Sequence, residues 1–234
     1  MTEIRTETVP LVDGSELRLT VAEPVGSVRG GIVVLHEARG VTDSVRRLVA
    51  GIAADGWLVV APHLYHRDGA DVLDPAETDE QVRNQINRLD GEQVMADTDT
   101  AFGWLAERSI TADRMGVVGF DLGGSVALLV AAKRTLGAAV TVAGGGISSP
   151  LSEGLPSLVA AAPGLTCPWL GIYGTPADGT TDPELQRLSA AAESSGVATN
   201  LVTYPQSGYR FDADPEASAD AWQRMLNWFD SHLR

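Results

Sequence analysis

The stretch Val117-Val118-Gly119-Phe120-Asp121-Leu122-Gly123-Gly124-Ser125 joins a short apolar run to a segment of small residues. A strand that passes through Gly-x-Asp-x-Gly-Gly into a helix has the pattern of a nucleophile elbow, where small residues permit a tight strand-to-helix turn. We expect Asp121 to stand exposed in a strained conformation, with the Leu122 N–H placed for an oxyanion. The positive end of the following helix lies behind it and favours negative charge. This stretch therefore predicts a reactive position at Asp121.

Strand and helix patterns alternate on both sides of this stretch. Two strands with period-two alternation come first, joined by Asp13-Gly14, a hairpin signal. The predicted strands are 4–12, 16–23, 30–36, 57–61, 115–119, 138–143, 169–173 and 199–204, and the predicted helices are 45–55, 92–107, 125–133, 182–196 and a last one that opens at 214–216. Repeated strand-helix units predict an α/β fold, with a mostly parallel sheet of about eight strands and helices on both faces.

Ligands of such sheets bind at the carboxyl ends of the strands. The segments to watch are therefore those that follow each strand: 36–41, 62–68, 119–124, 144–150, 174–181 and 205–211. Two longer stretches, 62–78 and 144–166, are predicted to be irregular and to form a rim or lid.

Composition limits the class of protein. The 234 residues suit one domain, 1–234, that buries a continuous core. A net charge of −14 opposes binding to nucleic acid or an anionic membrane. No apolar run of about 18 residues predicts a membrane span, and the first ten residues lack a signal-peptide pattern. Cys167 is the only cysteine, so no internal disulfide forms and a cytoplasmic location is expected.

Five segments in order resemble the dienelactone hydrolase family, whose members have the α/β-hydrolase fold. Its elbow Gly-Phe-Cys-x-Gly-Gly is similar to 119–124, and its His-Glu-x-x-Gly matches His36-Glu37-Ala38-Arg39-Gly40. Its Ala-Pro-Asp-Leu-Tyr resembles 61–65, with His63 in place of the aspartate. Its glycine-to-aspartate stretch resembles 174–178, with one extra residue, and its Tyr-Pro-x-x-x-His-x-Phe resembles 204–211.

The resemblance implies a catalytic set in which two members have changed. In the family, the elbow cysteine attacks an ester or lactone carbonyl, a histidine takes its proton, an aspartate orients the histidine and a glutamate controls the thiol. Asp178 and Glu37 match the two acids, whereas Asp121 and Tyr209 stand at the nucleophile and base positions. Tyrosine is a poor base near neutral pH, and removal of either the nucleophile or the base costs a factor of about 10⁶ in turnover. We therefore expect a route other than Cys-His-Asp hydrolysis.

Three hypotheses for Asp121 stay open at this point. An elbow aspartate can be a nucleophile, with His63 as the substitute base that activates water. Alternatively, the resemblance implies that Glu37 lies close to Asp121, so that one carboxyl group is a general acid or base beside Tyr209 in an isomerase, lyase or cyclase. The third hypothesis is a ligand-binding pseudoenzyme that has kept the pocket and lost the chemistry.

The remaining expectations concern ligands. Segments that follow strands supply a predicted substrate-binding set, which is Ala38, Leu122, Arg39, Tyr65, His66 and Arg210. Arginines can hold a substrate carboxylate. The chain lacks His-x-x-x-His and Cys-x-x-Cys spacing and a dinucleotide fingerprint, so neither a metal nor a cofactor is expected. The expected partner is a small-molecule substrate, and the protein is expected to be a monomer or homodimer.

Overall fold

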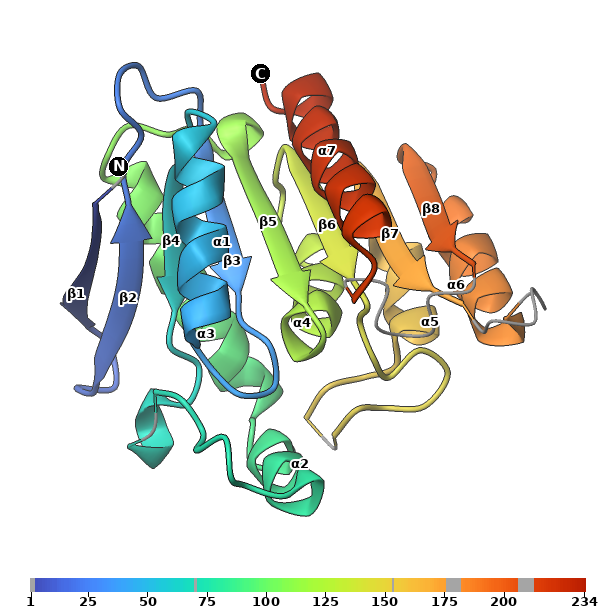
Figure 1. The fold of residues 1–234 in the computed structure, drawn as a ribbon, viewed down its shortest axis with the longest axis horizontal. Helices are drawn as coiled ribbons and strands as arrows, with labels where there is room; N and C mark the ends of the chain where they lie inside the picture. The colour runs from blue at the N-terminus through green and yellow to red at the C-terminus, as the bar shows by residue number, and fades with distance from the viewer. Residues whose placement is uncertain (1–2, 70, 153, 176–181, 206–212) are drawn as a thin grey trace.

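Eight strands form one sheet in the order β1-β2-β4-β3-β5-β6-β7-β8 (Figure 1). The structure is a computed structural model and describes residues 3–69, 71–152, 154–175, 182–205 and 213–234. β2 pairs antiparallel with β1 and with β4, and all other neighbours are parallel. The strands are β1 (Ile4–Pro10), β2 (Glu16–Ala22), β3 (Gly31–Leu35), β4 (Leu58–Pro62), β5 (Met115–Phe120), β6 (Ala138–Val142), β7 (Trp169–Gly174) and β8 (Thr199–Tyr204).

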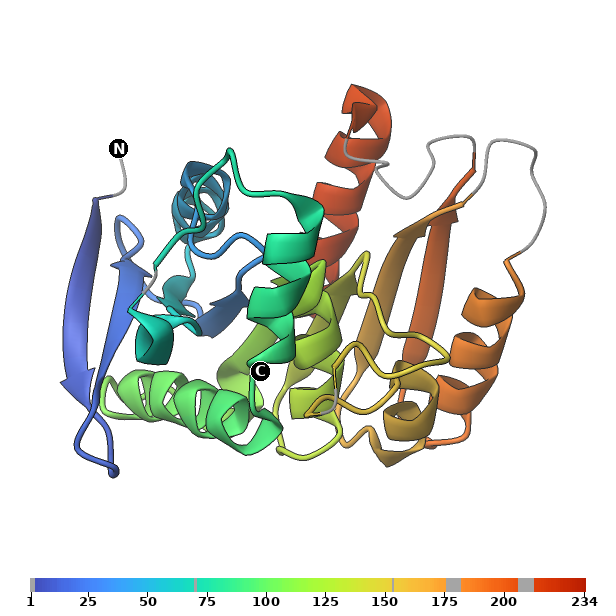
Figure 2. The same ribbon diagram turned by 90° about the horizontal axis from the view of Figure 1, so that it is seen from below.

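Helices cover both faces of this sheet (Figures 1 and 2). Helices α1 and α7 pack on one face in a cluster that includes Trp57 and Phe229, and α3 to α6 pack on the other around Trp104 and Trp169. The helices are α1 (Asp43–Ala54), α2 (Asp79–Asn87), α3 (Gly91–Ala106), α4 (Leu122–Ala131), α5 (Leu158–Ala161), α6 (Pro183–Glu193) and α7 (Pro215–His232), with short 3-10 turns η1 (His66–Asp68), η2 (Ala112–Arg114) and η3 (Ala162–Gly164). The predicted fold class, an α/β-hydrolase fold, is confirmed.

Burial follows the pattern expected of a parallel sheet. Strands β3, β4, β6 and β7 are buried along their whole length, because helices cover both of their faces. Within the described residues, no helix is both long and apolar enough to cross a membrane.

The sequence analysis did not predict two helices, α2 and the short α5, which lies in the stretch 144–166 that was expected to be irregular. Helix α2 follows the stretch 62–78 and begins with a capping box, in which Thr78 and Gln81 bond each other's backbone N–H groups. The Thr-x-x-Gln spacing was the signal for it, but the short and polar helix carries little apolar periodicity. α4 also begins three residues earlier than predicted, directly at Leu122.

The glycines of the elbow are required by close backbone packing. A Cβ atom on Gly123 would lie 2.1 Å from the Leu35 carbonyl oxygen, and one on Gly119 would lie 1.8 Å from the Gly123 oxygen. Helix α4 can therefore approach the end of β3 only because these positions lack side chains. This approach brings the start of α4 next to the segment that follows β3.

Candidate active site

Asp121 occupies the turn between β5 and α4. Its backbone has φ +53° and ψ −116°, a conformation that non-glycine residues rarely adopt. The turn is held in place because the Asp121 N–H donates to the Val142 carbonyl oxygen at 2.9 Å. The side chain is exposed, and its Oδ2 accepts a hydrogen bond from the Ala38 N–H at 3.3 Å. The strained, exposed elbow predicted from the sequence is confirmed, and strain of this kind clusters at functional sites.

A cavity of about 470 Å³ opens beside this carboxylate. Its lining is made by Glu37, Ala38, Arg39, Asp79, Val82, Arg83 and Asp121. Asp121 and three residues after β3 thus meet in one place, as the sequence predicted. The contribution of α2 to the wall was missed, because the helix itself was missed. Three acids and two arginines in one lining suit a polar small molecule.

Glu37 and Arg39 are both held by neighbouring groups. The Thr42 hydroxyl donates to Glu37 Oε1 at 2.8 Å, and Thr42 Oγ1 also accepts from the Val45 N–H at the start of α1. The Arg39 guanidinium donates to the carbonyl oxygens of Asp74 and Glu77 at 3.0 and 3.1 Å. Arg39 therefore links the segment after β3 to residues 74–77. These two hydrogen bonds use part of the donor capacity of its guanidinium.

Tyr65 lies beneath the cavity wall. It is 1% exposed, and its hydroxyl donates to the Ala38 carbonyl oxygen at 2.8 Å. Burial raises the pKa of Tyr65 well above its usual range, and the negative charge of Asp121 adds to this shift. Tyr65 was predicted to bind substrate; its buried hydroxyl donates to the backbone of Ala38, so this arrangement gives that prediction no support, and it stays untested.

His63 was predicted to replace the missing base, and the structure places it in a separate buried network. Its Nε2 lies 2.8 Å from Thr20 Oγ1, and its Nδ1 lies 2.7 Å from Asp71 Oδ1. The imidazole is 1% exposed, and burial lowers its pKa. With both ring nitrogens engaged, the geometry does not favour His63 as the base for Asp121, and that role stays an untested prediction.

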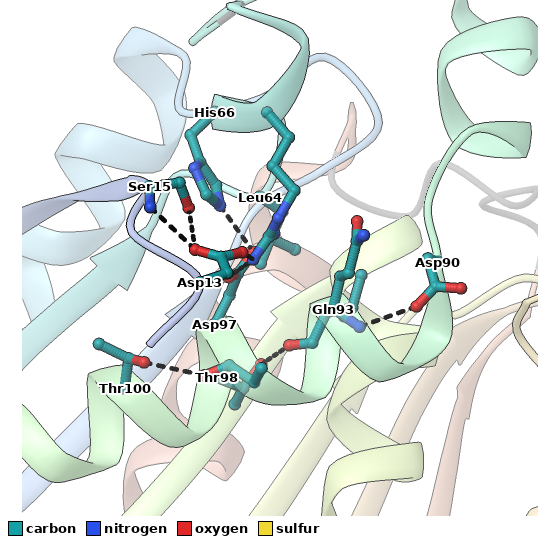
Figure 3. Close-up of polar contacts among 12 residues, drawn as sticks. Asp13, Ser15, Leu64, His66, Asp90, Gln93, Asp97, Thr98 and Thr100 are labelled. Carbon is teal, nitrogen blue, oxygen red and sulfur yellow. Dashed lines mark hydrogen bonds and ion pairs between the residues drawn. The ribbon is translucent and has the colours of Figure 1, made fainter. Parts of the chain in front are cut away.

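His66 also lies in a buried network. Its Nε2 is 3.1 Å from Asp97 Oδ2, and the Arg67 guanidinium donates to both oxygens of Asp97 at 2.7 and 2.9 Å. Figure 3 shows His66 pointing toward Asp97 on α3, with Asp13 of the β1–β2 turn alongside. We call Asp97, Arg67 and His66 the Asp97 cluster. A substrate-binding role for His66, predicted from its position after β4, gains no support from this arrangement.

The other predicted residues fall into two groups. Leu122 opens α4, so its N–H is among the first-turn amides that lack an intrahelical acceptor. Asp178, Tyr209 and Arg210 lie outside the described residues. In the part of the chain that is described, no three His, Cys, Asp or Glu side chains form a group that could hold a metal ion.

The comparisons with known proteins agree with this architecture. The family model described as "Dienelactone hydrolase family" matches residues 17–233. A Salmonella typhimurium protein named as a candidate carboxymethylenebutenolidase is 32% identical over 205 residues, which cover 85% of this chain and 76% of that protein. The carboxymethylenebutenolidase of Pseudomonas putida is 32% identical over 146 residues, which cover 60% of this chain and 61% of that protein.

A solved structure adds the same conclusion from geometry. The crystal structure of a candidate dienelactone hydrolase from Klebsiella pneumoniae superimposes with a TM-score of 0.88 at 27% identity, and the match covers 99% of this chain and 100% of that one. Fold, elbow and sequence similarity over nearly the whole length therefore lead to one assignment. The chain belongs to the dienelactone hydrolase family.

Proposed function

We propose that this protein hydrolyses a small ester or lactone and that the Asp121 carboxylate is the reacting group, acting as a general base on water. The observation that carries the proposal is the exposed Asp121 carboxylate at a strained elbow, facing a cavity of about 470 Å³. The relatives named as dienelactone hydrolases supply the substrate class by analogy. By the resemblance of 119–124 and 204–211 to the family's segments, we place Asp121 and Tyr209 where the family has cysteine and histidine.

The reaction balances with one carboxylate and one water molecule. Asp121 takes a proton from water as the water oxygen bonds to the carbonyl carbon, which gives a tetrahedral oxyanion. We assign the stabilisation of that oxyanion to the Leu122 N–H, because it belongs to the first turn of α4, whose amides have no intrahelical acceptor. Collapse breaks the bond to the leaving alkoxide, which receives the proton from Asp121, and an acid and an alcohol result. A positioned general base contributes a factor of about 10² to 10⁴.

Direct attack by water is favoured over attack by Asp121 itself. A covalent aspartyl intermediate needs a second base to activate the water that releases it. His63 was the sequence candidate for that base, and both of its nitrogens are engaged with Thr20 and Asp71. The general-base route needs only the carboxylate that already faces the cavity.

A single turnover in ¹⁸O-labelled water separates these routes. Excess enzyme is mixed with dihydrocoumarin or 4-nitrophenyl acetate, and the masses of the product acid and of the peptide containing Asp121 are measured. General-base hydrolysis places ¹⁸O in the product acid in the first turnover, leaves the peptide mass unchanged and gives no acyl adduct of the Asp121 peptide in acid-quenched samples. An acyl adduct on that peptide, or unlabelled product acid with ¹⁸O in the peptide, would show that Asp121 is the nucleophile and would overturn the proposed role.

A second function is supported by the pair of carboxyl groups in the lining. Because Glu37 and Asp121 border the same cavity, proton transfer on carbon is possible without hydrolysis. Deuterium uptake from heavy water into an enolisable ketone, lost in Asp121→Asn, would favour this isomerase-type chemistry. Binding of dihydrocoumarin with neither hydrolysis nor deuterium uptake would favour a pseudoenzyme.

A further inference from the structure

The Ala38 N–H is the described backbone donor that contacts the Asp121 carboxylate, at 3.3 Å. Under the proposed function, on which this inference rests, the direction of that N–H decides where the reacting carboxylate sits. Ala38 belongs to the segment after β3, which pairs with residues 71–73 through Gly40 and Val72 and through the Leu73 N–H, a donor to the Arg39 carbonyl oxygen at 2.9 Å. These contacts lie beyond the two peptide units that flank Ala38. The contacts that fix the two peptide units on either side of Ala38 therefore affect the position of the reacting carboxylate.

The first of these peptide units is held by His36. The His36 ring is fully buried, its Nδ1 lies 2.8 Å from the Glu37 carbonyl oxygen, and its Nε2 lies 3.1 Å from the Leu64 backbone nitrogen. Because Leu64 N–H can only donate, Nε2 is the acceptor and Nδ1 carries the proton. Burial lowers the pKa of His36 to about 4, which keeps this neutral tautomer in place near neutral pH.

That hydrogen bond acts on the same peptide plane as the Ala38 N–H. The Glu37 carbonyl oxygen accepts from His36 Nδ1 and also from the Gly40 N–H at 3.0 Å. Donors to a peptide carbonyl polarise the unit and strengthen its own N–H as a donor. His36 therefore both orients the Ala38 N–H and makes it a better partner for a carboxylate.

The second peptide unit is held by Tyr65. The Tyr65 hydroxyl donates to the Ala38 carbonyl oxygen at 2.8 Å, and its ring lies 5.0 Å from the His36 ring, centroid to centroid. Residues from the ends of β3 and β4 thus bracket Ala38 from both sides.

We propose that His36 and Tyr65 are positioning residues that clamp the two peptide units of Ala38 and so hold the Ala38 N–H against the Asp121 carboxylate. Neither side chain lines the cavity; they act through Ala38. We call this pair the Ala38 clamp. The proposal requires that each hydrogen bond of the clamp changes turnover through Asp121 more than it changes substrate binding.

Two matched pairs of variants test the clamp. Tyr65→Phe removes only the hydroxyl, and Tyr173→Phe is its control, since Tyr173 has a buried hydroxyl without a hydrogen-bond partner in the described structure. His36→Asn keeps a donor near the Nδ1 position, whereas His36→Gln keeps an acceptor near Nε2 and loses the donor. The readouts are kcat and KM on 4-nitrophenyl acetate and the amide proton shift and exchange rate of Ala38 by NMR.

The clamp predicts a loss of kcat of about tenfold in Tyr65→Phe, with KM within about twofold, because one hydrogen bond is removed. The Ala38 amide proton should also shift upfield and exchange faster. Tyr173→Phe should match the wild type, and His36→Gln should lose more kcat than His36→Asn.

Equal effects of Tyr65→Phe and Tyr173→Phe on kcat and on the Ala38 amide would overturn the clamp, as would equal effects of the two His36 variants. If the wild type turns over no ester, the proposed function fails, and the Ala38 amide alone still decides whether the clamp exists.

Discussion

Asp121 and Asp97 are both carboxylates of the same fold, and their surroundings are opposite. Asp97 is fully buried, and its two oxygens accept from Arg67 and lie beside His66 (Figure 3). Asp121 is exposed beside a cavity and has one described backbone donor, Ala38 N–H at 3.3 Å. A carboxylate whose acceptor sites are filled stabilises a fold, whereas one with free acceptor sites and access to a cavity can take a proton. The two carboxylates therefore differ in how many of their acceptor sites are occupied by described donors and in whether a cavity lies beside them.

Asp121→Asn is expected to give the largest effect, and it tests whether this carboxylate is catalytic or structural. Asp121→Asn keeps a residue type that tolerates positive φ but removes the base, so turnover should fall about 10³-fold. Because the side chain is exposed, the free energy of unfolding should change by less than about 1 kcal/mol. Ester hydrolysis and urea unfolding measure the two quantities. Retention of more than a tenth of the turnover would show that Asp121 is not the base.

A substitution in the Asp97 cluster should instead lower the free energy of unfolding and leave turnover nearly unchanged. Asp97→Asn removes the buried carboxylate that binds Arg67 through two oxygens and leaves only the more exposed Asp13, 3.7 Å from the guanidinium, so the free energy of unfolding should fall by about 3 kcal/mol. Turnover per folded molecule should stay within about twofold. Asp99→Asn on the same helix is the control, because Asp99 pairs with Arg134 at the surface and its loss should cost only about 0.5 kcal/mol. Equal losses in both variants would remove the distinction between a saturated buried carboxylate and a surface one.

Histidine burial near the elbow predicts a pH dependence of stability. The pKa of His36 is lowered to about 4 by burial, while an unfolded histidine titrates near 6.5. Between these values the unfolded chain binds more protons, so stability falls as the pH drops through this window. The contribution is about 3 kcal/mol, present in full above pH 6.5 and lost by about pH 4.

Unfolding in urea at a series of pH values measures this loss, and His36→Asn is the comparison. His63, whose pKa is also lowered by burial, adds a slope of the same sign that the variant retains. A variant with the same pH slope as the wild type would show that His36 does not contribute.

The sequence predicted the elbow at Asp121 but not the hydrogen-bond partners of the polar side chains that follow β4. The elbow at Asp121 was predictable because small residues permit a tight strand-to-helix turn, and its meeting with Glu37 was predictable from the resemblance to the dienelactone hydrolase family. The partners of His63, Tyr65 and His66 were not, because a strand-end position does not reveal which way a side chain points. His63 bonds Thr20 and Asp71, which are 43 and 8 residues away. Such pairings depend on packing that no local pattern encodes.

The smallest expected effect concerns the wall that sequence patterns missed. Arg83 on α2 lines the same cavity as Asp121, whereas Arg88 at the end of the same helix does not belong to the lining. If Arg83 binds an anionic group of the substrate, Arg83→Gln should raise KM about tenfold for an ester that carries a carboxylate and leave a neutral ester of similar size unchanged. Arg88→Gln should leave KM for both esters unchanged. An equal rise for both esters in Arg83→Gln would mean that α2 shapes the cavity without reading charge. In that case Arg83 would form no ion pair with the substrate, unlike Arg67, which pairs with Asp97. The cavity beside Asp121 would then differ from the Asp97 cluster only in being open to small molecules.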